Sequence, residues 1–138
     1  MSRCEVQRAK FNLTFDLLKG GSLAENIKDR TKKLAVDIIR FCEKFAKETK
    51  YFVIEKQIMR SATSVGANYR AACRARSKAE FIAKLGIVEE EADETLYWFE
   101  IILELKSEYE EEIRPLYKEM QEILAIIISS KKTARSRK

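Results

Sequence analysis

The sequence predicts an all-α protein, folded as an antiparallel up-down four-helix bundle that follows a short N-terminal extended arm. One proline and four glycines among 138 residues are too few for a loop-rich or all-β protein. Leu, Ile, Ala, Glu, Lys and Arg dominate, which favours helices. Four long segments repeat apolar residues with a 3.6-residue period and are joined by short connections. The predicted division is an arm at 1–22, a bundle at 23–131 and a basic tail at 132–138.

The arm has the periodicity of a strand. Phe11, Leu13, Phe15 and Leu17 alternate with polar residues, although a short helix is the alternative interpretation. The rest of the sequence has no second strand signal. An extended arm would therefore pair with another subunit or lie on the bundle.

The first two helices are expected at about 23–48 and 51–75. Ser22 and Glu25 form a capping box at the start of the first helix. The second helix has a middle rich in small residues, among them Gly66. Glycine in a helix interior costs about 1 kcal/mol relative to alanine, so Gly66 predicts that a neighbouring backbone comes close.

The third helix is expected at about 78–107, after a capping box made by Ser77 and Glu80. Its apolar residues form two stripes, and the second lies roughly 145° from the core stripe at about 100° per residue. This second stripe consists of Ile87, Trp98, Ile101 and Leu105. Because one bundle buries one face of each helix, the second stripe predicts a contact between subunits.

The fourth helix is expected at about 111–131, with Pro115 in its first turn, where proline is tolerated. The run 123–128 is apolar on all sides, so Ile126 and Ile128 are assigned to the same predicted interface. The basic tail that follows is expected to fray into solvent.

Composition argues against several classes of protein. Without histidine, the commonest general base and transition-metal ligand is missing. The sequence shows no nucleophile–base pair, phosphate loop or metal cage, so we expect neither an enzyme nor a cofactor. Its three cysteines share no CxxC spacing, which indicates free thiols in a reducing cytoplasm. No signal peptide or membrane-spanning run is apparent, so no membrane contact is expected.

Charge is strongly segregated along the chain. Residues 1–84 have a net charge of +10, residues 85–130 of −10, and residues 131–138 of +5. The acidic part includes Glu90 and Glu94, one helical turn apart. Bundled di-metal sites use an ExxH pair and this sequence has no histidine, so pairing with basic residues is preferred over a metal site.

Two basic elements are candidate nucleic-acid contacts. The first is a stripe about 27 Å long at 1.5 Å per residue, made by Lys56, Arg60, Arg70 and Arg74. It suits a phosphate backbone, but a solvated face or pairing with acidic residues of the later helices is the alternative. The second is the basic C-terminal segment of the chain, with Lys131, Lys132, Arg135 and Arg137. The alternative is a solubilising tail.

Polar and aromatic residues of the helices have two interpretations. Asn68 either sets helix register or binds a ligand, and the structural role is preferred. Four aromatic residues are able to stack on bases, although packing is preferred at these helical spacings; they are Tyr69, Tyr97, Trp98 and Phe99.

Several stretches carry a resemblance: Arg60–Glu94, within it Ser64–Asn68, Ala71 and Arg76–Phe81, and then Leu124–Arg135. They resemble a family of bacterial four-helix bundle proteins encoded in intervening sequences of large-subunit ribosomal RNA genes. The similarity covers about residues 24–135. It implies a ring-like homo-oligomer, with a pentamer favoured. A related branch, the accessory variability proteins of diversity-generating retroelements, forms basic pentameric barrels that bind RNA and a reverse transcriptase. The family has no catalytic residues to transfer.

The sequence therefore predicts a non-enzymatic, oligomeric RNA-binding accessory protein. The alternative is a protein-interaction scaffold or adaptor ring, including a reverse-transcriptase accessory subunit of a diversity-generating retroelement.

Overall fold

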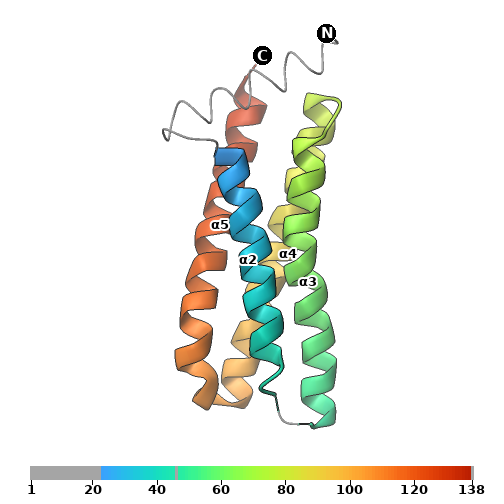
Figure 1. Ribbon diagram of the computed structural model, residues 1–138. Coiled ribbons are helices and arrows are strands. Elements are labelled where there is room, and N and C mark those ends of the chain that lie inside the picture. Colours follow the sequence, from blue (N-terminus) through green and yellow to red (C-terminus); the bar gives the residue numbers. More distant parts are fainter. Residues whose placement is uncertain (1–22, 46, 138) are drawn as a thin grey trace.

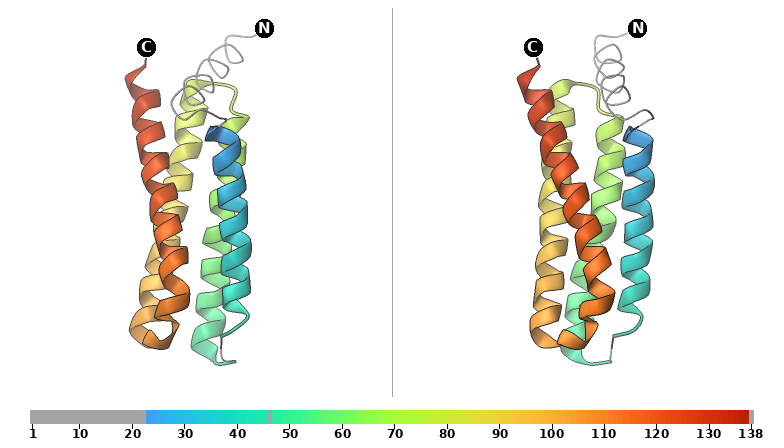
Figure 2. Two further views of the ribbon diagram at one scale, coloured as in Figure 1. Left: turned by 60° about the vertical axis from the view of Figure 1, so that its left-hand side comes forward. Right: turned by 90° about the vertical axis from the view of Figure 1, so that its left-hand side faces the viewer.

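The computed structural model describes residues 23–45 and 47–137 (Figure 1). They form helices α2 (Leu23–Cys42), α3 (Thr49–Cys73), α4 (Lys78–Leu105) and α5 (Glu110–Ser136), with the short 3-10 helix η1 (Ser107–Tyr109) before α5. Successive helices run antiparallel, and α2 and α4 each pack between α3 and α5 (Figure 2). The predicted all-α four-helix bundle is confirmed. The predicted arm and the Ser22 cap lie outside the described residues.

Each helix contributes one apolar stripe to the core. Its fully buried side chains include Ile27, Ile38, Ile58, Leu85, Phe99, Ile102, Ile113, Ile123 and Ile127. Their spacing of three or four residues is that of a helix face turned inward. The predicted core stripes therefore meet in one continuous interior.

An aromatic cluster closes one end of the bundle, where the α2–α3 and α4–α5 connections lie (Figure 1). Phe41, Phe45, Tyr51 and Tyr109 have neighbouring ring centroids 5.1 to 5.6 Å apart. Edge-on and tilted rings at such distances attract one another beyond the apolar area they bury. We call this the aromatic end.

The first helix is shorter than predicted. It ends at Cys42 rather than near residue 48. The backbone N–H groups of Lys44 and Phe45 donate to the carbonyls three residues earlier, each over 3.1 Å. This tighter turn is found where a helix ends, and it accompanies the packing of Phe45 against Tyr51.

The last helix is longer than predicted, and the expected fraying after residue 131 is wrong for 132–136. α5 continues to Ser136 because Ser130 and Ala134 are buried and extend the stripe of Ile127. Pro115 is likewise not in the first turn. It is the sixth residue of a helix that begins at Glu110.

Short polar contacts fix the register of α3 and α4. Thr95 Oγ1 donates to Ser61 Oγ over 2.9 Å, and both side chains are fully buried.

At the start of α4, Ser77 Oγ accepts from the N–H of Glu80 over 3.0 Å. The Glu80 carboxylate accepts from the N–H of Arg76, one residue before the cap, over 2.9 Å. These bonds confirm the predicted capping interaction of Ser77 and Glu80. In a standard capping box the Glu80 carboxylate would accept from the N–H of Ser77, whereas here it accepts from the N–H of Arg76.

Candidate nucleic-acid interface at one end of the bundle

Basic side chains gather at the end of the bundle opposite the aromatic end. The start of α2, the α3–α4 connection and the end of α5 meet there (Figure 1). They carry Lys28, Lys32, Arg70, Arg74, Arg76, Lys78, Lys84, Lys131, Lys132, Arg135 and Arg137. Within residues 70–84 and 130–137, Glu80 is the one acidic residue. We call this region the basic end.

The far half of the predicted basic stripe is already compensated by other groups. Arg60 Nη1 lies 3.3 Å from Glu91 Oε2, and its other terminal nitrogen contacts Glu94. Lys56 Nζ lies 4.9 Å from the centroid of the Phe52 ring, within the range of a cation–π contact. For Arg60, pairing with acidic residues of the next helix is therefore what the structure shows.

The near half of the stripe carries its charge into solvent. Arg70 and Arg74 are both exposed, one turn apart at the end of α3. No ion pair within residues 23–45 and 47–137 involves either guanidinium. The predicted stripe is thus divided, and its uncompensated part lies at the basic end.

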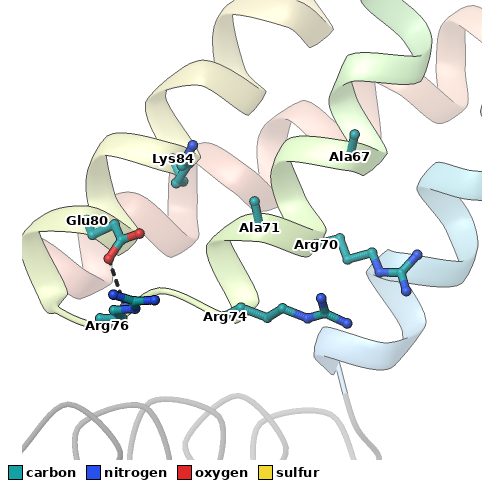
Figure 3. Close-up of a pocket in the computed structure, with 7 residues that line it drawn as sticks. All are labelled: Ala67, Arg70, Ala71, Arg74, Arg76, Glu80 and Lys84. Atoms are coloured by element: carbon teal, nitrogen blue, oxygen red, sulfur yellow. Dashed lines mark hydrogen bonds between the residues drawn. The ribbon is translucent and has the colours of Figure 1, made fainter.

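A hollow of about 510 Å³ lies beside this part of α3. Its lining is formed by Ala67, Arg70, Ala71, Arg74, Arg76, Glu80 and Lys84 (Figure 3). Two alanines of α3 provide small apolar side chains to this lining, and four cations contribute to it from α3, the connection and α4. Figure 3 shows the side chains of Arg70 and Arg74 extending in the same direction. Of the predicted site residues, Arg70 and Arg74 are the two that line the hollow.

Sequence reasoning missed Arg76 and Lys84. Arg76 directly precedes Ser77, the residue that caps the start of α4, and Lys84 lies in the second turn of that helix. In an antiparallel pair, residues on both sides of such a connection lie close together. This signal identifies Arg76 and Lys84 as neighbours of Arg74.

The end of α5 contributes a second group of cations. Lys132 and Arg135 are exposed, and Arg137 is exposed at the cap of the helix. Lys131 is less exposed than these three residues, with only 17% of its side chain accessible, and its ammonium contacts the Glu89 carboxylate of α4. Lys131 therefore joins α5 to α4, while the others face solvent.

The predicted interface residues fall into two groups. Ile87, Leu105 and Ile128 are exposed by 37%, 47% and 44%. The other three are partly buried and pack against the core; they are Trp98, Ile101 and Ile126. Trp98 Nε1 is buried without a hydrogen-bond acceptor within the described part of the chain.

The aromatic candidates for base stacking are mostly internal. Tyr69 and Phe99 are buried, whereas Tyr97 is 54% exposed and meets Trp98 edge-on at 5.3 Å. Asn68 donates to the carbonyl of Ser64 over 2.9 Å. Such a local bond fits the structural role preferred for Asn68.

The described ranges 23–45 and 47–137 contain no group of three or more acidic or cysteine side chains placed to hold a metal ion. Within the same ranges, no helix has the length and apolar character needed to cross a membrane.

These features define a small all-α protein of the four-helix bundle class with one basic end. The family described as 23S rRNA-intervening sequence protein matches residues 25–129, and the chain belongs to this family. A solved structure of a Bacteroides thetaiotaomicron protein of unknown function from the S23 ribosomal protein family is 38% identical. The similarity covers 79% of this chain and 97% of that chain, with a TM-score of 0.73. No curated protein matches. The relation to retroelement accessory proteins stays a prediction.

Proposed function

We propose that this protein is a non-enzymatic RNA-binding accessory protein and that the basic end is its RNA-contacting surface. The observation that carries the proposal is the hollow between α3 and α4, whose lining contains four cations and a single carboxylate, that of Glu80. Cations without carboxylate partners keep their full attraction for phosphates.

The mechanism is electrostatic. Arg70, Arg74, Lys132 and Arg135 neutralise phosphates and release condensed counterions. The affinity for RNA then falls as the salt concentration rises, so the slope of log K against log salt is negative. Each lost phosphate contact reduces the magnitude of this slope by about 0.7 to 0.9. The family description refers to 23S rRNA, which agrees with RNA as the polyanion.

A charge-reversal pair with a matched control tests the proposal. Arg70→Glu with Arg74→Glu should abolish binding of a structured RNA fragment at about 0.1 M salt. The control, Lys47→Glu with Lys118→Glu, makes the same change in net charge at two exposed positions away from the basic end. Unchanged RNA affinity in the first variant, with its helical circular dichroism intact, contradicts the proposal.

We also propose that several copies assemble, with a pentamer favoured. Ile87 and Leu105 are exposed about 27 Å apart along α4 at 1.5 Å per residue. This spread supports lengthwise contact between bundles. Sedimentation of the wild type should give a multiple of the 16.1 kDa chain, and Leu105→Glu should shift it toward the monomer. A monomeric wild type contradicts this part of the proposal.

A protein-interaction scaffold is the second candidate function. Phe52 and Val53, which are adjacent at the aromatic end, are 59% and 51% exposed. Adjacent exposed apolar side chains are typical of sites that bind other proteins. Capture of partners from native lysate, with and without nuclease, separates the two functions. A protein partner that survives nuclease and is lost in Phe52→Ser favours the scaffold.

A further inference from the structure

We infer that the hollow between α3 and α4 is a discrete phosphate-binding site, which receives a phosphoryl group of the bound RNA. The inference rests on the proposed function and goes beyond it. A charged surface attracts RNA at any point along it, whereas a phosphate-binding site binds one phosphoryl group at one position.

Charge favours a phosphoryl group over a carboxylate. Four cationic side chains and one carboxylate line the hollow, which gives a formal charge of +3. A carboxylate brings one negative charge. A phosphate monoester brings about 1.5 to 2 at neutral pH, and neighbouring phosphodiesters bring one each.

The donors come from several directions. Arg70 and Arg74 contribute from the end of α3, with side chains that extend to the side away from Glu80 and Lys84 (Figure 3), while Arg76 contributes from the connection and Lys84 from α4. Guanidinium groups present forked N–H donors that match phosphate oxygens, while the ammonium acts as a point charge. The positive end of the α4 dipole lies at Lys78, beside Arg76 and Glu80, and adds to the attraction.

Two small side chains keep the hollow open. Ala67 and Ala71 line it, and Ala67 is exposed, so none of the helices α2 to α5 packs over its methyl group. A longer apolar side chain at Ala67 would occupy the hollow without changing any charge. The shape of the site is therefore separable from its electrostatics by mutation.

Glu80 limits the strength of the site. Its carboxylate accepts a hydrogen bond from the N–H of Arg76 over 2.9 Å and so orders the connection. Its negative charge also opposes an incoming phosphate. Glutamine at this position retains an acceptor oxygen and removes the charge, so Glu80→Gln should bind phosphate several-fold more tightly.

The experiment titrates inorganic pyrophosphate into the full chain by calorimetry at constant ionic strength. We expect saturable binding of one pyrophosphate per chain, lowered at least about ten-fold by Ala67→Leu and raised by Glu80→Gln. The matched control, Ala125→Leu, places the same side chain at an exposed position of α5 and should bind as the wild type does. Absence of saturable binding, or equal affinity in Ala67→Leu, overturns the inference.

The same variants with RNA identify the source of the phosphoryl group. If a terminal phosphate fills the site, a 5′-phosphorylated RNA binds more tightly than its 5′-hydroxyl form, and Ala67→Leu removes the difference. If an internal phosphodiester fills it, both RNAs bind equally and both are weakened by Ala67→Leu. Either outcome supports the inference, and RNA affinity unaffected by Ala67→Leu contradicts it.

Failure of the inference and failure of the proposed function differ in their results. RNA binding that depends on Arg70 and Arg74 but not on Ala67 retains the function and removes the site. Pyrophosphate binding without any RNA binding retains an anion site and removes the function.

Discussion

Gly66 of α3 lies so close to Thr31 of α2 that a Cβ atom on Gly66 would stand 3.1 Å from Thr31 Oγ1. Thr31 is itself buried, and its hydroxyl donates to the carbonyl of Lys28 over 3.0 Å. The hydroxyl thus fills the space between the two helices. This close approach explains a glycine in the middle of a 25-residue helix.

A pair of glycine substitutions tests this packing. Apart from its chain neighbours and its own helix backbone, no atom of the described residues lies within 4 Å of the position that a Cβ on Gly86 of α4 would take. Gly86→Ala should therefore stabilise the fold by about 0.5 to 1 kcal/mol. Gly66→Ala should lose that gain, because Thr31 has to move. Urea unfolding of both variants measures the difference. Equal stabilisation by the two changes would show that α2 moves aside freely.

Removing the charge of Arg60 should affect RNA binding less than removing that of Arg74. Arg60 is held by two carboxylates of α4, whereas Arg74 lines the hollow. We expect Arg74→Ala to lower the slope of log K against log salt by about 0.7 to 0.9 and Arg60→Ala to leave it nearly unchanged. Fluorescence anisotropy with one labelled RNA over a series of salt concentrations gives both slopes. A larger change in Arg60→Ala places the interface elsewhere along α3.

The buried hydroxyl pair should show energetic coupling. Thr95→Val removes the donor to Ser61, and Ser61→Ala removes the acceptor. Each change should destabilise the fold by about 1 kcal/mol, and the double variant should cost about 0.5 kcal/mol less than the sum. Unfolding free energies of the four proteins complete the cycle. Strict additivity would mean that the two hydroxyls act independently.

Stability at alkaline pH should depend on Cys42. Burial, and secondarily the charge of Glu55, raises the pKa of its thiol from 9.0 to about 12. The pKa of the thiol is higher in the folded state than in the unfolded state. The stability that the protonated thiol contributes is therefore complete below pH 9 and is lost as pH rises from about 9 to about 12. At pH 10.5 the stability lost is about 2 kcal/mol.

Cys42→Ala provides the comparison. Groups other than this thiol titrate equally in both proteins, so the difference between their stabilities isolates Cys42. The unfolding free energy of the Cys42→Ala variant should fall less steeply than that of the wild type between pH 8 and pH 10.5. Parallel curves would show that the thiol ionises without cost in the folded protein.

The fold was predictable because helix periodicity and capping are local signals. The stripe containing Ile58 and Val65 is read directly from the sequence, and both residues are fully buried. The ends of the helices depended on packing between distant residues. Phe45 leaves the helical path where it meets Tyr51 and Tyr109, and such contacts have no local pattern.

The candidate site was only partly predictable for the same reason. Helical position places Arg60 and Arg74 on one stripe, but only the pairing of α3 with α4 shows that Glu91 compensates one and not the other. The hollow depends on Arg76 and Lys84, which come together through the connection. Charge segregation along the sequence did indicate that pairing across helices would matter.

The basic end gives the molecule a permanent electric dipole along the bundle axis. A polyanion at a distance exerts a torque on such a dipole, so the protein turns its basic end forward before the first contact forms. Productive encounters then become more frequent than for randomly oriented collisions, and salt shortens the range over which the turning occurs. The arrangement of charges therefore governs how quickly the protein meets a phosphate backbone as well as how firmly it holds one.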